Sequence, residues 1–204
     1  ATITYTLGST GCKSTNIFQV FSQPSAIAGS SNVCVSGTTS LTNSGGGVWS
    51  SSSPGVATIG AGSGIVTGVT PGTTLITYTL STGCNTTKSI LVNPLPVAYA
   101  VTGGGSFCAG SSGANVGLSY SNSGVEYQLK LGGSAIGSVV NGSNSGLDFG
   151  PQTSTGTYTV SANNPLTGCS SNMTGSVAVN VNPLPVVHNV TGGGNVCIGG
   201  AGVA

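Results

Sequence analysis

Hydrophobic and polar residues alternate along short stretches of this chain, and clusters of glycine, serine, asparagine or proline separate those stretches. Threonine alternates with isoleucine, tyrosine, leucine or valine at 3–7 (ITYTL), within 73–80 (TTLITYTL) and at 157–160 (TYTV). A period of two is typical of a half-buried β-strand. Further strands are expected at 15–21, 56–59, 64–69, 87–92, 115–120, 125–131, 135–140 and 174–181.

The segments between the expected strands carry residues that favour tight turns, such as Ser53-Pro54-Gly55, Pro71-Gly72 and Gly132-Gly133. Glycine tolerates positive φ, and proline presets φ near −65°. No apolar residues recur at helical spacing, and a hydrophobic content of 37% is too high for a typical disordered chain. We therefore expect an all-β protein built of seven-strand β-sandwiches, each with fewer than about a hundred residues.

Two sequence repeats indicate a modular array. The segment VNPLPVAYAVTGGG at 92–105 returns as VNPLPVVHNVTGGG at 181–194, an offset of 89 residues, and TTLITYTLSTGC at 73–84 has a counterpart at 1–12. The predicted units are the C-terminal part of a preceding unit at 1–22, complete units at 23–95 and 96–184, and the first strands of a following unit at 185–204. We expect an excerpt from a longer array, formed either by one giant chain or by identical copies associating end to end.

Both predicted boundaries carry the sequence Asn-Pro-Leu-Pro. Pro94 and Pro96 lie at the first boundary, and Pro183 and Pro185 lie at the second. Two prolines fix φ and favour extended conformations in the residues before them. A short, semi-rigid linker is therefore expected, in preference to a proline-rich ligand for an aromatic groove, because flanking charge is missing.

The cysteines occur in two alternating contexts. Each of the first kind ends a Thr-Gly-Cys triplet, and each of the second lies in a short apolar strand such as Asn-Val-Cys or Ser-Phe-Cys. The first kind comprises Cys12, Cys84 and Cys169, and the second comprises Cys34, Cys108 and Cys197. No Cys-x-x-Cys or Cys/His cluster supports a zinc site, so disulfides in an oxidising compartment are expected.

Six cysteines allow fifteen connectivities, so the repeat must guide the choice. The simplest scheme pairs one cysteine of each kind inside a unit, Cys34 with Cys84 and Cys108 with Cys169. Cys12 and Cys197 would then bond to neighbouring units. A rival scheme, Cys12 with Cys34 and Cys169 with Cys197, would cross the unit boundaries.

Charge is nearly absent from this chain. The charged residues are Lys13, Lys88, Lys130, Glu126 and Asp148, and the net charge is +1. Three lysines cannot neutralise a nucleic-acid backbone, and two distant acids are a poor basis for a calcium site or a carboxylate-based enzyme. No apolar stretch is long enough to span a membrane. We expect no catalytic residue, no cofactor and no metal site.

The few reactive side chains are explained by structural positions without a chemical role. His188 takes the place of Tyr99 in the previous repeat, which indicates a half-exposed boundary residue. Glu126 and Lys130 are four residues apart in one expected strand and should face the same side as a weak surface pair. The alternative is an intramolecular Lys–Asn or Lys–Asp isopeptide bond, for which Lys130, Asp148 and Glu126 are the local candidates.

One stretch resembles a known family. VWSSSSPGVATIGAGSGIVTGVTPGTTLITYTL, at 48–80, contains a Trp-Ser-Ser strand, a Val-Ala-Thr strand, a Val-Thr-Gly-Val hairpin and a Gly-Thr…Ile-Thr-Tyr strand. In this order the elements resemble the group 2 bacterial immunoglobulin-like domain. The unit at 96–184 is less similar and resembles other immunoglobulin-like or PKD-like modules. The resemblance implies tandem immunoglobulin-like β-sandwiches with Trp49 in a core.

The resemblance also implies an extracellular module that spaces, stiffens or adheres, as in the surface adhesins and gliding-motility proteins that Bacteroidota export by the type IX pathway. We expect a cell-surface stalk or filament whose partners are adjacent copies or repeats of itself, with surface glycans as further candidates. The alternative is a carbohydrate- or surface-binding accessory module. It would need an exposed aromatic platform, and most tyrosines and Trp49 occupy positions expected to face inward.

Overall fold

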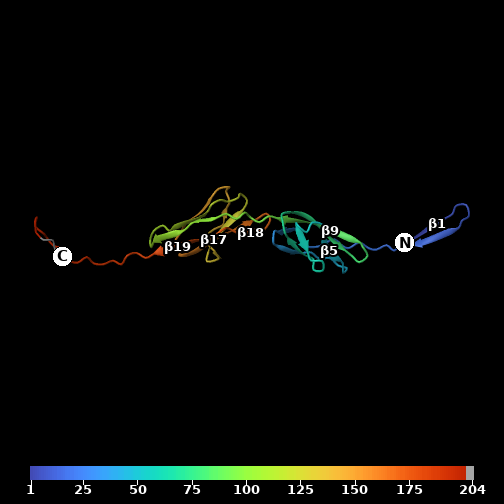
Figure 1. The fold of residues 1–204 in the computed structure, drawn as a ribbon, viewed down its shortest axis with the longest axis horizontal. Coiled ribbons are helices and arrows are strands. Elements are labelled where there is room, and N and C mark those ends of the chain that lie inside the picture. Colours follow the sequence, from blue (N-terminus) through green and yellow to red (C-terminus); the bar gives the residue numbers. More distant parts are fainter. Residues whose placement is uncertain (201–204) are drawn as a thin grey trace.

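The computed structural model describes residues 1–200. Every regular element in that range is a β-strand, and none of its segments is a helix long and apolar enough to cross a membrane. A hairpin, two β-sandwiches and an extended C-terminal segment follow one another along one long axis (Figure 1). The expected all-β array of sandwiches is confirmed.

The N-terminal hairpin consists of β1 (Thr2–Thr6) and β2 (Lys13–Ile17), paired antiparallel. All of its residues are exposed. Tyr5, at 67% exposure, occupies the place that Tyr78 takes at 3% exposure in the first sandwich. The hairpin thus matches part of the first sandwich in sequence, but its apolar side chains are exposed.

The N-terminal sandwich has a four-stranded sheet of order β3-β9-β8-β5 and a three-stranded sheet of order β4-β7-β6. Its first strand, β3, pairs parallel with its last strand, β9, and the other pairings are antiparallel. Two packed sheets with seven strands in total, arranged in this order, form an immunoglobulin-like sandwich. The strands are β3 (Asn32–Cys34), β4 (Thr38–Ser40), β5 (Val48–Ser51), β6 (Ala57–Ile59), β7 (Ile65–Gly68), β8 (Gly72–Thr79) and β9 (Asn85–Asn93).

The core of this sandwich lies between the two sheets. Trp49 is 7% exposed and packs on Tyr78, with 4.6 Å between the ring centroids. Trp49 thus takes the core position expected from the sequence. The inward-facing positions of β8 are Thr74, Ile76 and Tyr78, so Leu75 points outward at 48% exposure.

The C-terminal sandwich has a three-stranded sheet of order β10-β12-β16 and a larger sheet of order β11-β19-β17-β13-β14, to which β15 and β18 also pair. Its first strand is divided, since β10 joins one sheet and β11 pairs parallel with the last strand, β19, in the other. The strands are β10 (Val101–Gly103), β11 (Gly105–Cys108), β12 (Ala114–Leu118), β13 (Glu126–Leu131), β14 (Ser134–Ala135), β15 (Val140–Asn141), β16 (Leu147–Gln152), β17 (Gly156–Asn164), β18 (Cys169–Asn172) and β19 (Val177–Asn182).

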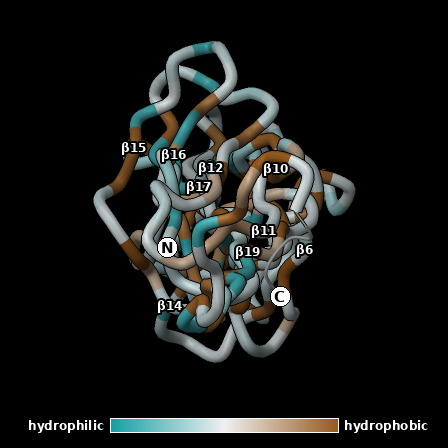
Figure 2. The backbone as a smooth tube through the Cα atoms, turned by 90° about the vertical axis from the view of Figure 1, so that its left-hand side faces the viewer, coloured by the Kyte–Doolittle hydropathy of each residue, from teal (hydrophilic) through white to brown (hydrophobic). Residues whose placement is uncertain are grey.

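A second, separate cluster of buried residues fills the C-terminal sandwich, with Tyr127, Leu129, Tyr158 and Val160 at its centre. Looking along the long axis, Figure 2 shows hydrophobic and hydrophilic positions interleaved along the strands. The expected strand at 135–140 is wrong as a continuous element: β14 ends at Ala135 and β15 begins at Val140. Gly137, at φ 64°, lies between them and breaks the extended conformation.

The parallel pairing of first and last strands sets the direction of each sandwich. Because both strands run the same way, the chain enters at one pole and leaves at the other. The turn that leads into the last strand therefore lies at the pole where the chain enters, and the end of the first strand lies at the pole where it leaves. These two poles carry the two kinds of cysteine.

Candidate functional site

The joint between the two sandwiches is the candidate functional site. It follows Asn93, the last residue of β9, and contains Pro94 and Pro96. Asn93 and Pro96 are buried, and the Ser171 hydroxyl of β18 donates a hydrogen bond of 2.8 Å to the Pro96 carbonyl. Pro96 is thus held against the C-terminal sandwich, whereas Pro94 is exposed.

Cys34 lies at the exit pole of the N-terminal sandwich. It is the last residue of β3 and pairs in register with Asn93. The next residue, Val35, donates its N–H to the Asn93 carbonyl at 3.0 Å, and the Cys34 carbonyl accepts the Gly37 N–H at 2.9 Å. This turn fixes the Cys34 side chain beside the joint.

Cys169 lies at the entry pole of the C-terminal sandwich. It begins β18 and pairs with Asn164, the last residue of β17. The preceding residue, Gly168, has φ 71°, a conformation that favours glycine, and its N–H donates to the Asn164 carbonyl at 2.8 Å. The Thr-Gly-Cys triplet is therefore a hairpin turn that presents its cysteine at the pole.

Cys34 and Cys169 form a disulfide across the joint, with 5.7 Å between their Cα atoms and 135 residues between them in sequence. The expected pairings Cys34–Cys84 and Cys108–Cys169 are therefore wrong, as are the rival pairings of Cys34 with Cys12 and of Cys169 with Cys197. The rival scheme also crosses unit boundaries, but it joins a Thr-Gly-Cys cysteine to the apolar-strand cysteine of the following unit. The observed bond joins an apolar-strand cysteine to the Thr-Gly-Cys cysteine of the following sandwich.

The strand directions explain the correction. Cys84 immediately precedes β9, whereas Cys34 pairs with Asn93 at the end of that strand. Nine residue steps of about 3.3 Å separate Cys84 from Asn93, so this strand holds the two cysteines about 30 Å apart. A disulfide requires Cα atoms within about 7 Å. Cys84 and Cys108 are instead free thiols, as are Cys12 and Cys197.

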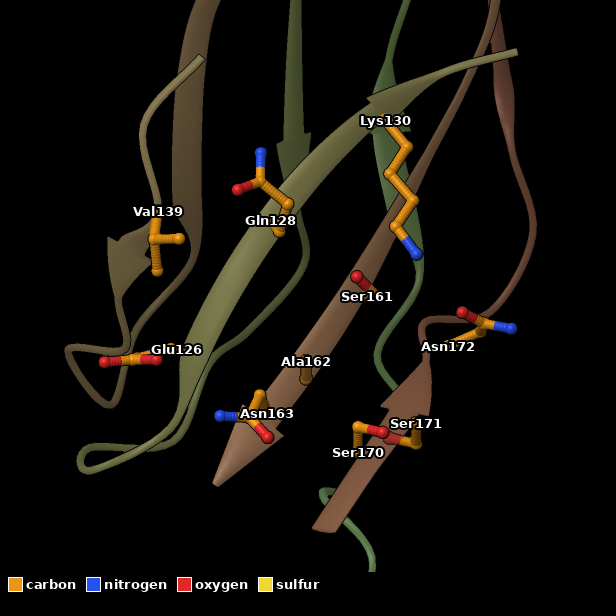
Figure 3. A pocket seen from close by; sticks show the side chains of 10 residues that line it. All are labelled: Glu126, Gln128, Lys130, Val139, Ser161, Ala162, Asn163, Ser170, Ser171 and Asn172. Atoms are coloured by element: carbon orange, nitrogen blue, oxygen red, sulfur yellow. The ribbon is translucent and has the colours of Figure 1, made fainter. Parts of the chain in front are cut away.

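A shallow hollow lies on the outer face of the C-terminal sandwich, over β13, β17 and β18 (Figure 3). Its residues alternate with the core: Glu126, Gln128 and Lys130 face outward, whereas Tyr127 and Leu129 are buried. Asparagine and serine side chains make up most of the remaining lining, together with Val139 and Ala162, so the hollow offers hydrogen-bond donors and acceptors. The sequence located only Glu126 and Lys130 of this surface.

The isopeptide alternative is not supported by the positions of its groups. Lys130 is half-buried on β13, and Asp148 lies on β16 in the opposite sheet. Asp148 accepts a hydrogen bond of 3.3 Å from the Asn115 amide. Glu126 and Lys130 share one face as expected, but their charged ends point in different directions (Figure 3).

Two further groups of side chains lie at the surface or close to it. Tyr120, 39% exposed, stacks obliquely on Tyr99 with 5.2 Å between the ring centroids. His188 lies in the extended segment after β19, and Pro183 and Pro185 in the same segment are also exposed. The second Asn-Pro-Leu-Pro motif therefore lacks the packing that surrounds the first.

No family model and no curated protein matches this chain. Among solved structures, domains 4 and 5 of the S-layer protein SbsC are similar at 17% identity, covering 80% of this chain and 100% of that one, with a TM-score of 0.36. The fibronectin(III)-like modules of Clostridium thermocellum CbhA are similar at 13% identity over 81% of this chain and 100% of theirs, with a TM-score of 0.39.

Murine CEACAM1b is similar at 13% identity over 77% of this chain and 99% of its own, with a TM-score of 0.37. All these TM-scores are below 0.5. The immunoglobulin-like assignment therefore follows from the strand order of this chain and not from its likeness to these proteins.

Proposed function

We propose that this chain is a structural module array that transmits tension outside the cell, as part of a surface stalk or filament. The observation that carries the proposal is the Cys34–Cys169 bond across the joint between two sandwiches. A persistent disulfide fits an oxidising, extracellular compartment. Its position at a joint serves the connection between modules rather than the core of either.

The bond changes the path of a force applied to the two ends of the chain. Tension that reaches Cys34 passes through the sulfur atoms to Cys169 and continues along β18 and β19. The residues between the two cysteines lie outside this path, including the joint and most strands of both sandwiches. The disulfide thus protects the modules from unfolding under load.

Single-molecule force spectroscopy tests the proposal. The oxidised chain, pulled at both ends, should not release the segment between Cys34 and Cys169. Reduction, or the double variant Cys34→Ser/Cys169→Ser, should add contour length from that segment. Its 135-residue separation at about 3.5 Å per residue corresponds to about 470 Å.

The variant Cys84→Ser/Cys108→Ser is the matched control, because it also removes two cysteines but leaves the bond across the joint. It should extend like the unaltered oxidised chain. Equal extension of the oxidised and reduced chains would contradict a role in transmitting tension.

The low charge of the chain suits an adhesive or self-associating surface. With a net charge of +1 there is little for salt to screen, so association with neighbouring copies should depend weakly on ionic strength. The family resemblance at 48–80 supports a bacterial surface adhesin, and gliding motility with type IX export in Bacteroidota is the most specific form of this proposal.

A carbohydrate-binding module is the second candidate, favoured by the polar hollow on the outer face of the C-terminal sandwich. Gln128, Asn163 and Asn172 line it with amide groups that match sugar hydroxyls. Glycan-array binding that is lost in Gln128→Ala/Asn163→Ala and retained in Cys84→Ser would support this candidate. Absence of binding to any glycan would leave the hollow without this role.

A further inference from the structure

At the outer poles of the two sandwiches, Cys108 and Cys84 hold the positions that Cys34 and Cys169 hold at the joint. Cys108 ends β11 and pairs in register with Asn182, as Cys34 ends β3 and pairs with Asn93. The Ala109 N–H donates to the Asn182 carbonyl at 2.9 Å, and the Cys108 carbonyl accepts the Ser111 N–H at 3.1 Å. These contacts repeat those of Val35 and Gly37 around Cys34.

Cys84 corresponds to Cys169, because it occupies the same position in the N-terminal sandwich that Cys169 occupies in the C-terminal sandwich. The preceding glycines have φ values of 86° at Gly83 and 71° at Gly168, and both turns present the cysteine at the entry pole. The Cys84 sulfur lies 3.9 Å from the Phe21 carbonyl. Phe21 precedes Pro24 by three residues, as Asn93 precedes Pro96, so Cys84 lies beside the place where a preceding sandwich would end its last strand.

The exit poles of the two sandwiches differ in exposure. Asn93 and Pro96 are buried at the joint, whereas Asn182 and Pro185 are exposed. Cys108 is exposed, and Cys34 is half-buried. The same sequence motif is thus covered at the joint and uncovered at the exit pole of the C-terminal sandwich in the described part of the chain.

We propose that the bond across the joint is one member of a repeating series. Cys108 bonds to the Thr-Gly-Cys cysteine of the sandwich that follows in the array, and Cys84 bonds to the apolar-strand cysteine of the sandwich that precedes. Cys197 and Cys12 belong to the same two classes and bond in the same direction. This inference rests on the proposed array, and it adds the partner and the direction of each bond.

Each bond forms by thiol–disulfide exchange. Two cysteine thiols lose two electrons and two protons to a disulfide oxidant, such as an oxidised dithiol protein outside the cytosol or oxidised glutathione in vitro. The oxidant becomes two thiols, and one S–S bond joins the neighbouring sandwiches.

A chain with one more sandwich tests the proposal. Residues 97–185 span one repeat, so inserting a second copy of them after Pro185 recreates the Asn-Pro-Leu-Pro joint and supplies Cys108 with the proposed partner. The chain is refolded with reduced and oxidised glutathione, and its free thiols are alkylated. Proteolysis at acidic pH, followed by mass spectrometry, then maps the disulfides.

The insertion adds a Cys108 and a Cys169 to the six cysteines of the chain. The proposal predicts that the number of alkylated thiols stays at the four of the unaltered chain. The new bond should join the first Cys108 to the second Cys169. In the control, Cys108→Ser in the first copy alone should expose one additional thiol, on the second Cys169, without removing the Cys34 bond.

The outcomes separate this inference from the proposed function. Two additional thiols, a bond between Cys108 and Cys169 of the same copy, or Cys108 bridging two chains would overturn the repeating series while leaving Cys34–Cys169 in place. Loss of Cys34–Cys169 in the unaltered chain would overturn the proposed function as well. Circular dichroism of both chains shows whether the added sandwich has folded.

Discussion

Buried polar groups in both sandwiches are consistently paired. The Thr74 hydroxyl, 3% exposed, accepts the Ser53 N–H at 3.1 Å and lies 3.2 Å from the hydroxyls of Ser51 and Ser52. The Tyr158 hydroxyl donates to the Ser154 carbonyl at 2.8 Å. Among the described residues, no buried side-chain nitrogen or oxygen lacks a partner. These threonine and tyrosine side chains therefore help to fix a single packing of the two cores.

Tyr127 is the titratable group in which burial should affect stability. Its side chain is fully buried and its oxygen accepts the Asn122 N–H at 2.9 Å. Burial raises the pKa of Tyr127 above its ordinary value near 10, the Asn122 hydrogen bond lowers this pKa, and nearby Tyr99 raises it. The folded state thus holds the phenol proton more tightly than the unfolded chain does.

This difference makes the stability of the C-terminal sandwich depend on alkaline pH. The contribution of neutral Tyr127 is complete below pH 10 and is lost as the pH rises through the folded-state pKa, with a slope of at most about 1.4 kcal/mol per pH unit. Tyr127→Phe should cost about 1 kcal/mol below pH 10 and should lack this slope.

Urea unfolding between pH 8 and 11, with the free thiols alkylated, measures the effect. The stability difference between the unaltered chain and Tyr127→Phe should narrow above pH 10. Tyr5→Phe in the exposed hairpin is the control and should leave both the stability and its pH dependence equal to those of the unaltered chain. A constant difference across this range would show that ionisation of Tyr127 is not coupled to folding.

At the scale of elements, the glycine run Gly103–Gly105 lets the first strand of the C-terminal sandwich change sheets. β10 ends at Gly103 and β11 begins at Gly105 in the other sheet. Gly104, at φ 74°, connects them, and a Cβ atom there would lie 2.7 Å from the Ala178 carbonyl oxygen and 2.9 Å from the Val177 Cβ. The crossing therefore requires both positive φ and the absence of a side chain.

Gly104→Ala should destabilise the sandwich more than Gly132→Ala does. Gly132, in the turn between β13 and β14, also has positive φ, at 56°, but has open space around an added Cβ. Both variants incur about 1–2 kcal/mol of left-handed strain, and Gly104→Ala should lose about 1–3 kcal/mol more by overpacking. Urea unfolding of the oxidised chains measures the difference, and equal losses would contradict the steric explanation.

The pattern of alternating residues predicts much of the fold because most longer strands have one buried and one exposed face. The strand predicted at 125–131 agrees with β13, and the predicted core position of Trp49 is confirmed. Short strands such as β3 and β4 have three residues each, too few to show a period. Leu75 faces outward because the buried place beside it belongs to hydrogen-bonded Thr74, which apolar patterning does not reveal.

The disulfide was mispredicted for a reason of strand direction. The repeat correctly divides the cysteines into two kinds, but local sequence does not show that β3 and β9 run parallel. Only that pairing places Cys34 and Cys84 at opposite poles of one sandwich. The burial of Pro96 and the Ser171 contact likewise depend on the neighbouring sandwich, so neither could be predicted from the linker motif.

At the scale of the whole molecule, resistance to proteolysis should follow the placement of the three lysines. Lys13 lies in the exposed hairpin, which has no core behind it. Two-stranded hairpins of this kind are marginally stable. Lys88 is half-buried in β9 and donates to the Ile27 carbonyl at 3.2 Å, and Lys130 lies in β13 between paired strands.

Trypsin should therefore cut the oxidised chain after Lys13 first and leave residues 14–204 as the main product. Intact-mass spectrometry over a time course identifies the cleavage sites. Lys13→Ala should remain uncut over the same period. Rapid cleavage after Lys88 or Lys130 would contradict the packing of the two sandwiches.

The long sequence interval closed by the bond at the joint sets the order in which the protein can mature. Cys34 is synthesised well before Cys169, and Cys84 and Cys108 are made in between as competing thiols. Correct pairing thus depends on β3 and β9 coming together first, since this holds Cys84 and Cys34 far apart. Oxidation before folding would join the wrong thiols. Export of the reduced chain, with oxidation only after the sheets have formed, would therefore give the highest yield of correctly paired protein.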